Sequence, residues 1–203
     1  MNKKNLFLLI SIAFFFTACA SNMTVTPKYE APKKENTSLA SVSTVKVKLG
    51  SFEDRREQKA ESILVGHREA AFGVPMGDIF SERPIFEIVR DTVKTELIRN
   101  GHTIVNNNEN ILIKGKINKF WVHTDVTAFY WDLVGEVSIM IEVSSPTRKT
   151  PTLLGPYSGK NVERTYINPS KELATRVLDK SLGDAMRAMS SDPKLARVIK
   201  SRR

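Results

Sequence analysis

The sequence predicts an α+β domain in which two main amphipathic helices pack on one face of a mostly antiparallel sheet. Residues 128–144 alternate apolar and polar side chains over a long stretch, which is typical of a strand with one buried face. Apolar residues recur at helical spacing in 84–100 and again after Ser170. In chain order the elements are β-α-β-β-β-α, which is typical of helices that cover one face of an antiparallel sheet.

The N-terminus predicts export. Two lysines precede an almost continuous apolar run from Leu6 to Phe16. This run is shorter than the roughly 20 apolar residues that span a bilayer, so residues 1–18 are expected to be a secretory signal peptide rather than an uncleaved anchor or a buried helix. The tetrapeptide Phe16-Thr17-Ala18-Cys19 resembles the lipobox of bacterial lipoproteins. The resemblance implies cleavage before Cys19, which becomes the lipidated first residue and the membrane anchor.

The surroundings of Cys19 agree with a lipid anchor. It is the only cysteine in the sequence, so an intrachain disulfide is excluded. Two or more acyl chains on one residue are enough for stable anchoring. Ala20 follows it, whereas an aspartate there retains enterobacterial lipoproteins in the inner membrane. The resemblance therefore implies the periplasmic face of the outer membrane.

Residues 19–43 contain prolines, lysines and small polar residues but few large apolar ones. Such a segment buries too little surface to fold, which predicts that the lipidated cysteine is followed by a flexible tether. The remaining residues, 44–203, are ordinary in apolar and charged content. We expect them to form a single periplasmic domain.

The first half of this domain predicts a strand, a long loop and a helix. Alternating apolar residues in 45–49 indicate a strand that ends at Gly50. Residues 51–79 are rich in charge and glycine, and we expect a loop that contains at most a short hairpin or a helical turn. A helix over 84–100 follows, with Pro84 in its first turn, Gly101 at its C-terminal cap, and an apolar stripe of Phe86, Val89, Val93 and Leu97.

A hairpin of two long strands is predicted next. The alternation of 111–117 shifts phase before Phe120, which indicates a bulge near Asn118-Lys119. This strand is expected to pair with 128–144 across a turn at 125–127. In 128–144 every odd position is apolar or glycine, including Phe129 and Trp131, so that face is predicted to be buried.

The C-terminal part predicts an edge strand and two helices. Residues 157–166 lie between prolines and form the weaker strand. Ser170 is the expected N-cap of a long helix. Asp192-Pro193 ends that helix, and the apolar residues of 195–199 indicate a final short one.

Several short motifs together form a familiar layout. They are Cys19, Asp54-Arg55-Arg56, Gly66, Leu97-Ile98-Arg99-Asn100-Gly101, Tyr157-Ser158-Gly159 and the helix from Val177-Leu178 to Met186. With these motifs the chain resembles the YajG-like family of bacterial lipoproteins. The resemblance implies a localisation and a fold more than an activity. Two other periplasmic groups share the general architecture, namely the auxiliary lipoproteins of lipid-transport ABC systems and the lipoprotein that plugs the lipopolysaccharide-export barrel.

Catalytic and metal-binding patterns are weak. His67, His102 and His123 have no metal-ligand spacing, so no metal and no cofactor are expected. No Gly-x-Ser-x-Gly motif is present. Glu136 and Glu142 are expected on the outward face of a strand as solvated charges, although paired carboxylates for glycan cleavage are the alternative. We therefore expect a protein that is not an enzyme.

Two clusters are candidate contact sites. Asp54-Arg55-Arg56 follows the first strand, where a carboxylate–guanidinium pair either pins the long loop to the sheet or recognises a ligand. Trp121, Tyr130 and Trp131 surround the hairpin turn. They are either core residues or an exposed aromatic tip that docks a partner or touches the membrane. A basic cluster near the C-terminus, either a solvated face or a contact for anionic groups, comprises Lys194, Arg197, Lys200, Arg202 and Arg203.

These observations predict a non-catalytic, membrane-anchored envelope lipoprotein that acts as a binding or accessory/assembly module. Besides the membrane, the expected partner is another envelope protein or an anionic envelope component. Nucleic acid is not expected, because the protein is exported and no basic–aromatic stacking platform is present. The alternative is an auxiliary lipoprotein that handles lipid or lipopolysaccharide, which requires an apolar groove of roughly 300 Å³ or more.

Overall fold

The computed structural model describes residues 21–31, 36–57, 61–148 and 150–202, and the predicted signal peptide and Cys19 lie outside them. The described residues form three α-helices, eight strands of one sheet and a short 3₁₀ turn. In chain order these are β1 (Met23–Val25), β2 (Lys46–Asp54), β3 (Leu64–Glu69), η2 (Ala71–Gly73), β4 (Pro75–Ser81), α2 (Ile85–Arg99), β5 (Thr103–Ile104), β6 (Ile111–Val126), β7 (Trp131–Ser144), β8 (Thr152–Thr165), α3 (Lys171–Ser190) and α4 (Pro193–Ser201).

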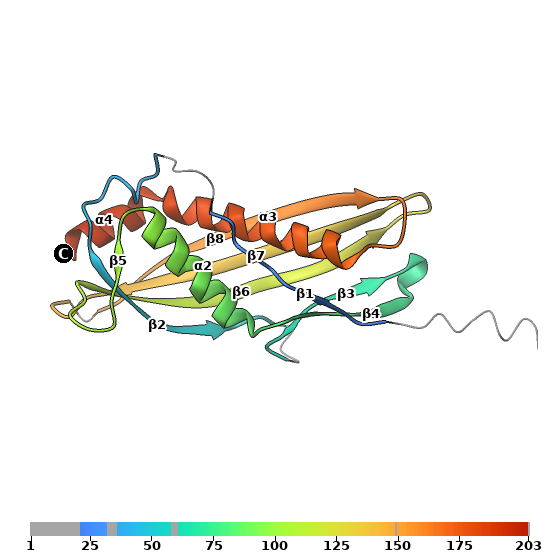
Figure 1. Ribbon diagram of the computed structural model, residues 1–203, viewed down its shortest axis with the longest axis horizontal. Helices are drawn as coiled ribbons and strands as arrows, with labels where there is room; N and C mark the ends of the chain where they lie inside the picture. The colour runs from blue at the N-terminus through green and yellow to red at the C-terminus, as the bar shows by residue number, and fades with distance from the viewer. Residues whose placement is uncertain (1–20, 32–35, 58–60, 149, 203) are drawn as a thin grey trace, which may run out of the picture.

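The sheet is built around β6 and β7. These strands pair antiparallel over their whole length, and β8 pairs antiparallel with the other side of β7 as an edge strand. The second side of β6 is shared by two strands. β2 runs parallel to its first half, and β3 forms one parallel ladder pair with it, Gly66 with Val122. Beyond these lie β5 next to β2, and β4 followed by β1 next to β3 (Figure 1).

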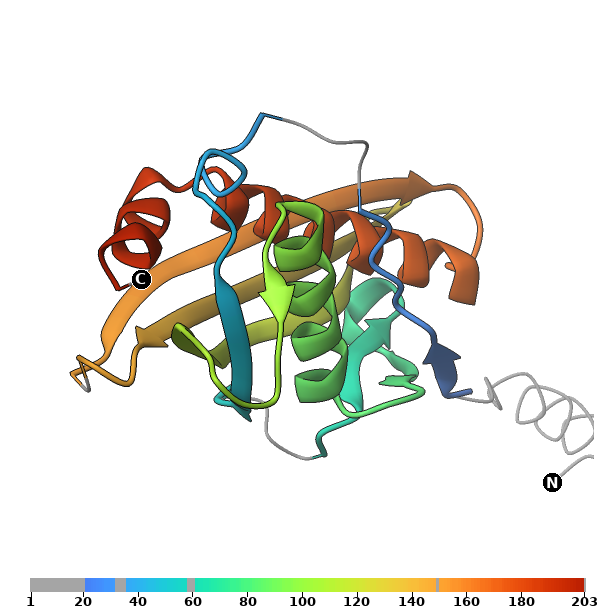
Figure 2. The ribbon, with the colours of Figure 1, turned by 60° about the vertical axis from the view of Figure 1, so that its left-hand side comes forward.

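Both main helices cover the same face of the sheet, as predicted. α3 packs along β7 and β8, and α2 packs on β2 (Figures 1 and 2). The odd-numbered side chains of β7 from Leu133 to Val143 point into this core and are buried. On the opposite face the carboxylates are paired, Glu142 with Lys116 at 3.4 Å and Glu136 with Lys160 at 3.2 Å. The fold is therefore the predicted α+β class.

The hairpin turn lies later than predicted. β6 runs to Val126, and the turn covers 127–130, where Thr127 N–H donates to Tyr130 O at 3.0 Å and the Thr127 hydroxyl accepts from Tyr130 N–H at 3.1 Å. β7 begins only at Trp131, which is half-buried, and Phe129 in the turn is 83% exposed. The prediction that both side chains lie in the core was therefore wrong. The bulge before Lys119 is confirmed.

The segment 51–79 is not a long loop. β2 continues to Asp54, and β3 and β4 form an antiparallel hairpin. β3 approaches β6 very closely, since a Cβ added at Gly66 would lie 2.1 Å from Val122 O. These strands are short and rich in charged residues, so an alternation of apolar and polar side chains is not visible in the sequence.

The described part of the predicted tether packs on the domain. β1 pairs in parallel with β4, and Val25 and Leu39 are fully buried. We call residues 21–31 the strap. The part of the strap that follows β1 crosses α3 and α2. In the strap, Lys28 N–H donates to Asp179 Oδ1 at 2.7 Å, and the Tyr29 hydroxyl donates to Glu96 Oε2 at 2.5 Å. Few apolar residues are enough to hold this segment on the domain, because each of them packs between elements that are distant in the sequence.

The helix ends largely follow the predicted signals. Ser170 caps α3 by accepting from Leu173 N–H at 3.3 Å, and Asp192 caps α4 by accepting from Lys194 N–H at 2.7 Å. Pro84 is the N-cap residue of α2 rather than part of its first turn. Gly101 has φ +88°, the left-handed conformation that favours glycine after a helix.

α3 lies unusually close to the sheet because two glycines face it. A Cβ added at Gly159 would lie 2.0 Å from Ser181 O, and one added at Gly135 would lie 2.5 Å from Val177 Cγ1. The Ser181 hydroxyl donates to Gly135 O at 2.9 Å. Backbone and side-chain atoms therefore fill the interface between α3 and the two strands.

We predict that Gly159→Ala lowers the free energy of unfolding by about 1–3 kcal/mol, because the added methyl group overpacks a backbone contact that cannot yield. Gly183→Ala is the matched control. An added Cβ there meets nothing within 4 Å, and alanine raises helix stability by up to about 1 kcal/mol. Urea unfolding followed by circular dichroism measures both. Equal effects of the two substitutions would contradict the close packing of α3.

Candidate functional site

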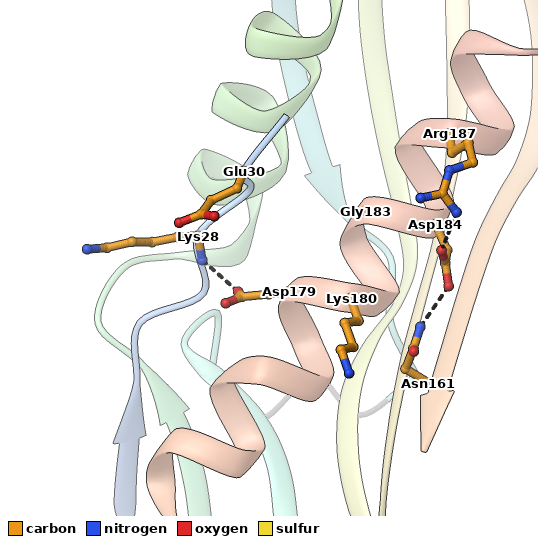
Figure 3. A pocket seen from close by; sticks show the side chains of 8 residues that line it. All are labelled: Lys28, Glu30, Asn161, Asp179, Lys180, Gly183, Asp184 and Arg187. Atoms are coloured by element: carbon orange, nitrogen blue, oxygen red, sulfur yellow. Dashed lines mark hydrogen bonds and ion pairs between the residues drawn. The ribbon is translucent and has the colours of Figure 1, made fainter. Parts of the chain in front are cut away.

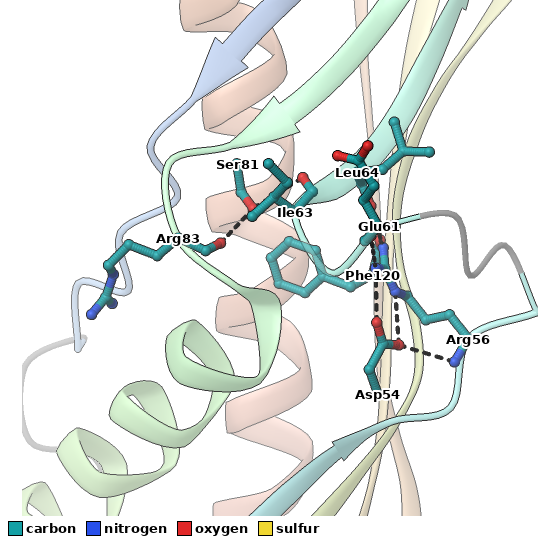
Figure 4. Close-up of polar contacts among 8 residues, drawn as sticks. All are labelled: Asp54, Arg56, Glu61, Ile63, Leu64, Ser81, Arg83 and Phe120. Atoms are coloured by element: carbon teal, nitrogen blue, oxygen red, sulfur yellow. Dashed lines mark hydrogen bonds and ion pairs between the residues drawn. The ribbon is translucent and has the colours of Figure 1, made fainter.

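The Arg56 guanidinium joins three parts of the sheet (Figure 4). Its side chain is fully buried and pairs twice with Asp54, from Nε to Oδ1 and from Nη2 to Oδ2, both at 3.0 Å. Nη1 donates to Leu64 O at 2.5 Å and to Phe120 O at 3.1 Å, and Nη2 also donates to Glu61 O at 3.3 Å. One side chain thus ties the end of β2 to the start of β3 and to β6.

This geometry decides between the two interpretations of the Asp54-Arg55-Arg56 cluster. Arg56 is enclosed and its donors are engaged within the protein, so it is not a ligand contact. The preceding residue, Arg55, is exposed and pairs with the exposed Glu53 at 2.8 Å. The cluster therefore pins the segment before β3 to the sheet, and of its two arginines only Arg55 remains accessible.

The three predicted aromatic residues do not form one exposed tip. Trp121 is buried against His67, with ring centroids 4.9 Å apart in an edge-on contact. Tyr130 is half-buried beneath the Arg164 guanidinium, whose carbon lies 3.5 Å from the ring centroid. Arg164 also makes a bidentate pair with Asp132, and these hydrogen bonds hold the pKa of Asp132 below its usual range. Trp131 is half-buried at the start of β7.

Other apolar residues gather at the same end of the molecule. Phe72 is fully exposed, and Phe129, Tyr166 and Ile167 are 75–83% exposed. None of these side chains except Phe129 was singled out from the sequence, because short turns carry no periodicity. Together they define what we call the apolar end: Phe72, Val74, Phe129, Tyr166 and Ile167.

Three turns meet at the apolar end, at the right of Figure 1. The β3–β4 turn lies beside the β6–β7 turn, since Glu69 N–H donates to the Thr124 hydroxyl at 2.8 Å and that hydroxyl donates to Glu69 O at 3.0 Å. The β8–α3 loop joins them through the pairing of Thr165 with Trp131, and the Tyr130 and Tyr166 rings lie 6.5 Å apart.

The opposite end carries α4 and the predicted basic cluster. Lys194, Arg197 and Lys200 are exposed at spacings of three residues, whereas Leu195 and Ile199 pack into the core. Arg202 is buried and belongs to the fold rather than to the cluster. Its guanidinium donates to Thr150 O at 3.0 Å and to the Thr152 hydroxyl at 2.6 Å, which pins the β7–β8 turn. Arg203 lies outside the described residues.

A cavity of about 540 Å³ lies between the strap and α3 (Figure 3). Charged and amide side chains line it, including Lys28, Glu30, Asn161 and Arg187. Burial raises the pKa of Asp179 on its wall to about 6, although the Lys28 N–H bond opposes the rise. This lining suits water and polar solutes rather than acyl chains.

The described part of the chain contains no group of three or more His, Cys, Asp or Glu side chains arranged to hold a metal ion. His102 is buried after α2, and neither ring nitrogen has a hydrogen-bond partner among the described residues. Burial lowers the pKa of His102, so its ring is neutral at pH 7. No helix within the described ranges has both the length and the apolar run that crossing a membrane requires.

We predict that Arg56→Gln lowers the free energy of unfolding by about 3–5 kcal/mol, because it leaves the Asp54 carboxylate and two carbonyl oxygens poorly paired. Arg56→Lys should not restore the loss, since one ammonium cannot reproduce the bidentate pair. Arg55→Gln is the control and should change stability by less than about 1 kcal/mol. Chemical denaturation measures all three, and a mild Arg56→Gln variant would contradict the pinning role.

We also predict that Asp179→Asn raises stability at pH 7.5, because asparagine keeps the acceptor for Lys28 N–H without a buried charge. A carboxyl group with a raised folded-state pKa favours folding below its unfolded pKa and loses that contribution as the pH rises through about 6. Asp179 is only half-buried and solvent screens its charge, so the gain should be no more than about 1–2 kcal/mol at pH 7.5 and vanish towards pH 4. Unfolding curves across this range test it, and a gain that does not change with pH would contradict it.

The comparisons with known proteins agree with this architecture. Protein XCC0632 from Xanthomonas campestris superposes with a TM-score of 0.58 at 5% identity, over 89% of this chain and 99% of that one. At such low identity the likeness concerns the fold alone. A minor lipoprotein from Acinetobacter baumannii gives a TM-score of 0.39 at 9% identity, over 79% of this chain and 93% of the other. No curated protein sequence matches the chain.

A family model described as "uncharacterized lipoprotein" matches residues 32–200. The match covers most of the described part of the chain, from α2 to α4 and every strand except β1. It confirms the resemblance that the sequence indicated. The chain belongs to this YajG-like family of bacterial lipoproteins.

Proposed function

We propose that this lipoprotein is a non-catalytic binding or accessory module of the bacterial envelope, held at the membrane by acyl groups on Cys19. The lipobox-like sequence before Cys19 supports removal of residues 1–18 and acylation of the new N-terminus. Ala20 supports the periplasmic face of the outer membrane. The family itself supports anchoring through lipid.

The observation that carries the binding role is the cationic face of α4. Lys194, Arg197 and Lys200 are exposed on one face of the helix, and none of the ion pairs among the described residues includes them. Most other cations among the described residues are engaged, such as Arg176 and Lys180 with Glu163. An unpaired row of three cations attracts and orients an anionic surface. The partner of this face is therefore an acidic surface of another envelope protein or an anionic envelope component.

The lipid-handling alternative has less support. It needs an apolar groove between the helices and the sheet, but Gly135 and Gly159 let α3 approach the strands too closely to leave one there. Charged side chains line the cavities described on this molecule, including the cavity beside Asp179. The third possibility is an enzyme of the cell wall that cleaves glycans with paired carboxylates, and the pairing of Glu136 and Glu142 with lysines argues against it.

A crosslinking experiment tests the proposal. We predict that a photoreactive residue at the exposed position Ser201 forms one adduct of constant mass in membranes of the native host. Because the attraction depends on charge, Lys194→Glu/Arg197→Glu/Lys200→Glu should reduce that adduct at least tenfold. The control variant Lys46→Glu/Lys94→Glu/Lys171→Glu makes the same change of charge at other exposed lysines and should retain it. Mass spectrometry identifies the adduct.

Two outcomes would count against the proposal. Equal loss in the two triple variants would mean that only net charge matters, not the α4 face. Adducts with phospholipid or lipopolysaccharide acyl chains alone would favour the lipid-handling alternative. The melting temperatures of both variants confirm that each remains folded.

A further inference from the structure

We propose that the apolar end of the domain rests on the bilayer surface and inserts its turn side chains among the lipid headgroups. This inference rests on the proposed acylation of Cys19. It adds an orientation, with the apolar end at the membrane and the α4 end in the periplasm. It also makes a lipid surface, rather than a protein, the partner of the exposed aromatic residues.

The first step is the place where the chain enters the domain. Ser21 N–H donates to Met76 O at 3.1 Å, next to the start of β4. The buried Arg68 guanidinium donates to Ser21 O and, at 3.1 Å, to Met76 O. β1 then continues in parallel with β4, away from the β3–β4 turn. The described chain therefore begins at the apolar end and is fixed there (Figure 1).

The second step is the length of chain between this point and the anchor. Cys19 precedes Ser21 by two residues, and two residues of fully extended backbone span at most about 7 Å. An acylated Cys19 lies in the lipid headgroup region, so Ser21 lies at most about 7 Å from that region. Within the predicted tether of residues 19–43, residues 21–31 are the strap, which packs on α2 and α3.

The third step is the chemistry of the end that is brought to the membrane. Aromatic residues favour the interface between lipid and water, and the apolar end presents Phe129 and Tyr166 from two neighbouring turns. Phe72 contributes from the third turn, with φ +63° and a fully exposed ring. A large side chain in the left-handed conformation is uncommon and strained, and such strain clusters at contact sites. At Phe72 this backbone conformation directs the ring away from the protein.

Charge favours the same orientation. At the apolar end Arg164 is neutralised by its bidentate pair with Asp132 and stacks on Tyr130. Helix α4, which carries Lys194, Arg197 and Lys200, lies at the far end (Figure 1). Contact with the bilayer therefore depends on apolar insertion and not on attraction to anionic lipids. Since the lipid anchor holds the three turns beside the membrane, a weak affinity of their side chains for lipid is enough to keep them in contact with the bilayer.

The test uses the full chain, purified with its acyl groups and reconstituted into vesicles of phosphatidylethanolamine and phosphatidylglycerol. Cys19 is the only cysteine, and acylation blocks its thiol, so Phe129→Cys supplies a single site for a bimane label. Leu153→Cys is the control site, half-exposed on β8 near the opposite end. We expect phospholipids brominated on their acyl chains to quench the label at position 129 at least threefold more than the label at 153, independently of salt and of phosphatidylglycerol.

A second pair of variants identifies the cause of quenching. Phe72→Asp/Ile167→Asp should lower quenching of the label at 129 to the level seen at 153. Ile98→Asp/Leu153→Asp replaces exposed apolar side chains elsewhere and should leave quenching unchanged. Each variant is compared by its melting temperature, so that loss of fold is recognised.

The outcomes separate the two proposals. An acylated protein whose label at 129 is quenched no more than the label at 153 would overturn the membrane contact and leave the lipid anchor intact. The apolar end would then be open to a protein partner. A chain with a reactive Cys19 thiol and no acyl mass would overturn the proposed function and this inference with it.

Discussion

The buried Arg56 guanidinium is the interaction on which the N-terminal half of the structure depends. A charge without water is costly unless it is paired and hydrogen-bonded, and here Asp54 and three backbone carbonyl oxygens satisfy it. β3 and β6 share one ladder pair, and together with this pair, the Glu69–Thr124 hydrogen bonds and the His67–Trp121 contact, the guanidinium helps to hold the β3–β4 hairpin to the sheet. The hairpin in turn provides the edge on which β1 pairs. These contacts, from Arg56 to the β3–β4 hairpin and on to β1, therefore fix the position and the direction of the chain at Ser21.

The sequence predicted the parts of the fold whose signals are local and repeated. Strands β6 and β7, the bulge before Lys119 and the cap at Ser170 each have a periodicity or a residue type that needs no knowledge of distant elements. The described parts of the predicted tether gave no such signal. Val25 in the strap and Leu39 after it are single apolar residues in polar surroundings, and they are buried only against segments that are distant in the sequence. The same holds for the charged and glycine-rich β3–β4 hairpin.

The candidate sites were predicted less well, for a related reason. Arg55 and Arg56 are identical neighbours, yet one is exposed and the other fully buried, because only Arg56 faces the carbonyl oxygens of β3 and β6. Trp121 lies within β6 rather than at the turn, and it packs on His67 of β3. Phe72 and Ile167 lie far apart in the sequence and meet only because three turns end together. Lipidation at Cys19 depends on a short local motif, which is why sequence alone suggests it.

The molecule thus has two unlike ends joined by long strands, an apolar end where the chain enters and a cationic end at α4. β7 alone has 14 residues, which at 3.3 Å per residue extend about 45 Å. The central claim is that the strap holds the domain on the membrane, and neutron reflectometry of the acylated protein on a supported bilayer tests it most directly. The account predicts protein density that begins at the headgroups and continues for about 45 Å. A water layer of roughly 25 Å between headgroups and protein, as a flexible tether over residues 19–43 would give, would contradict it.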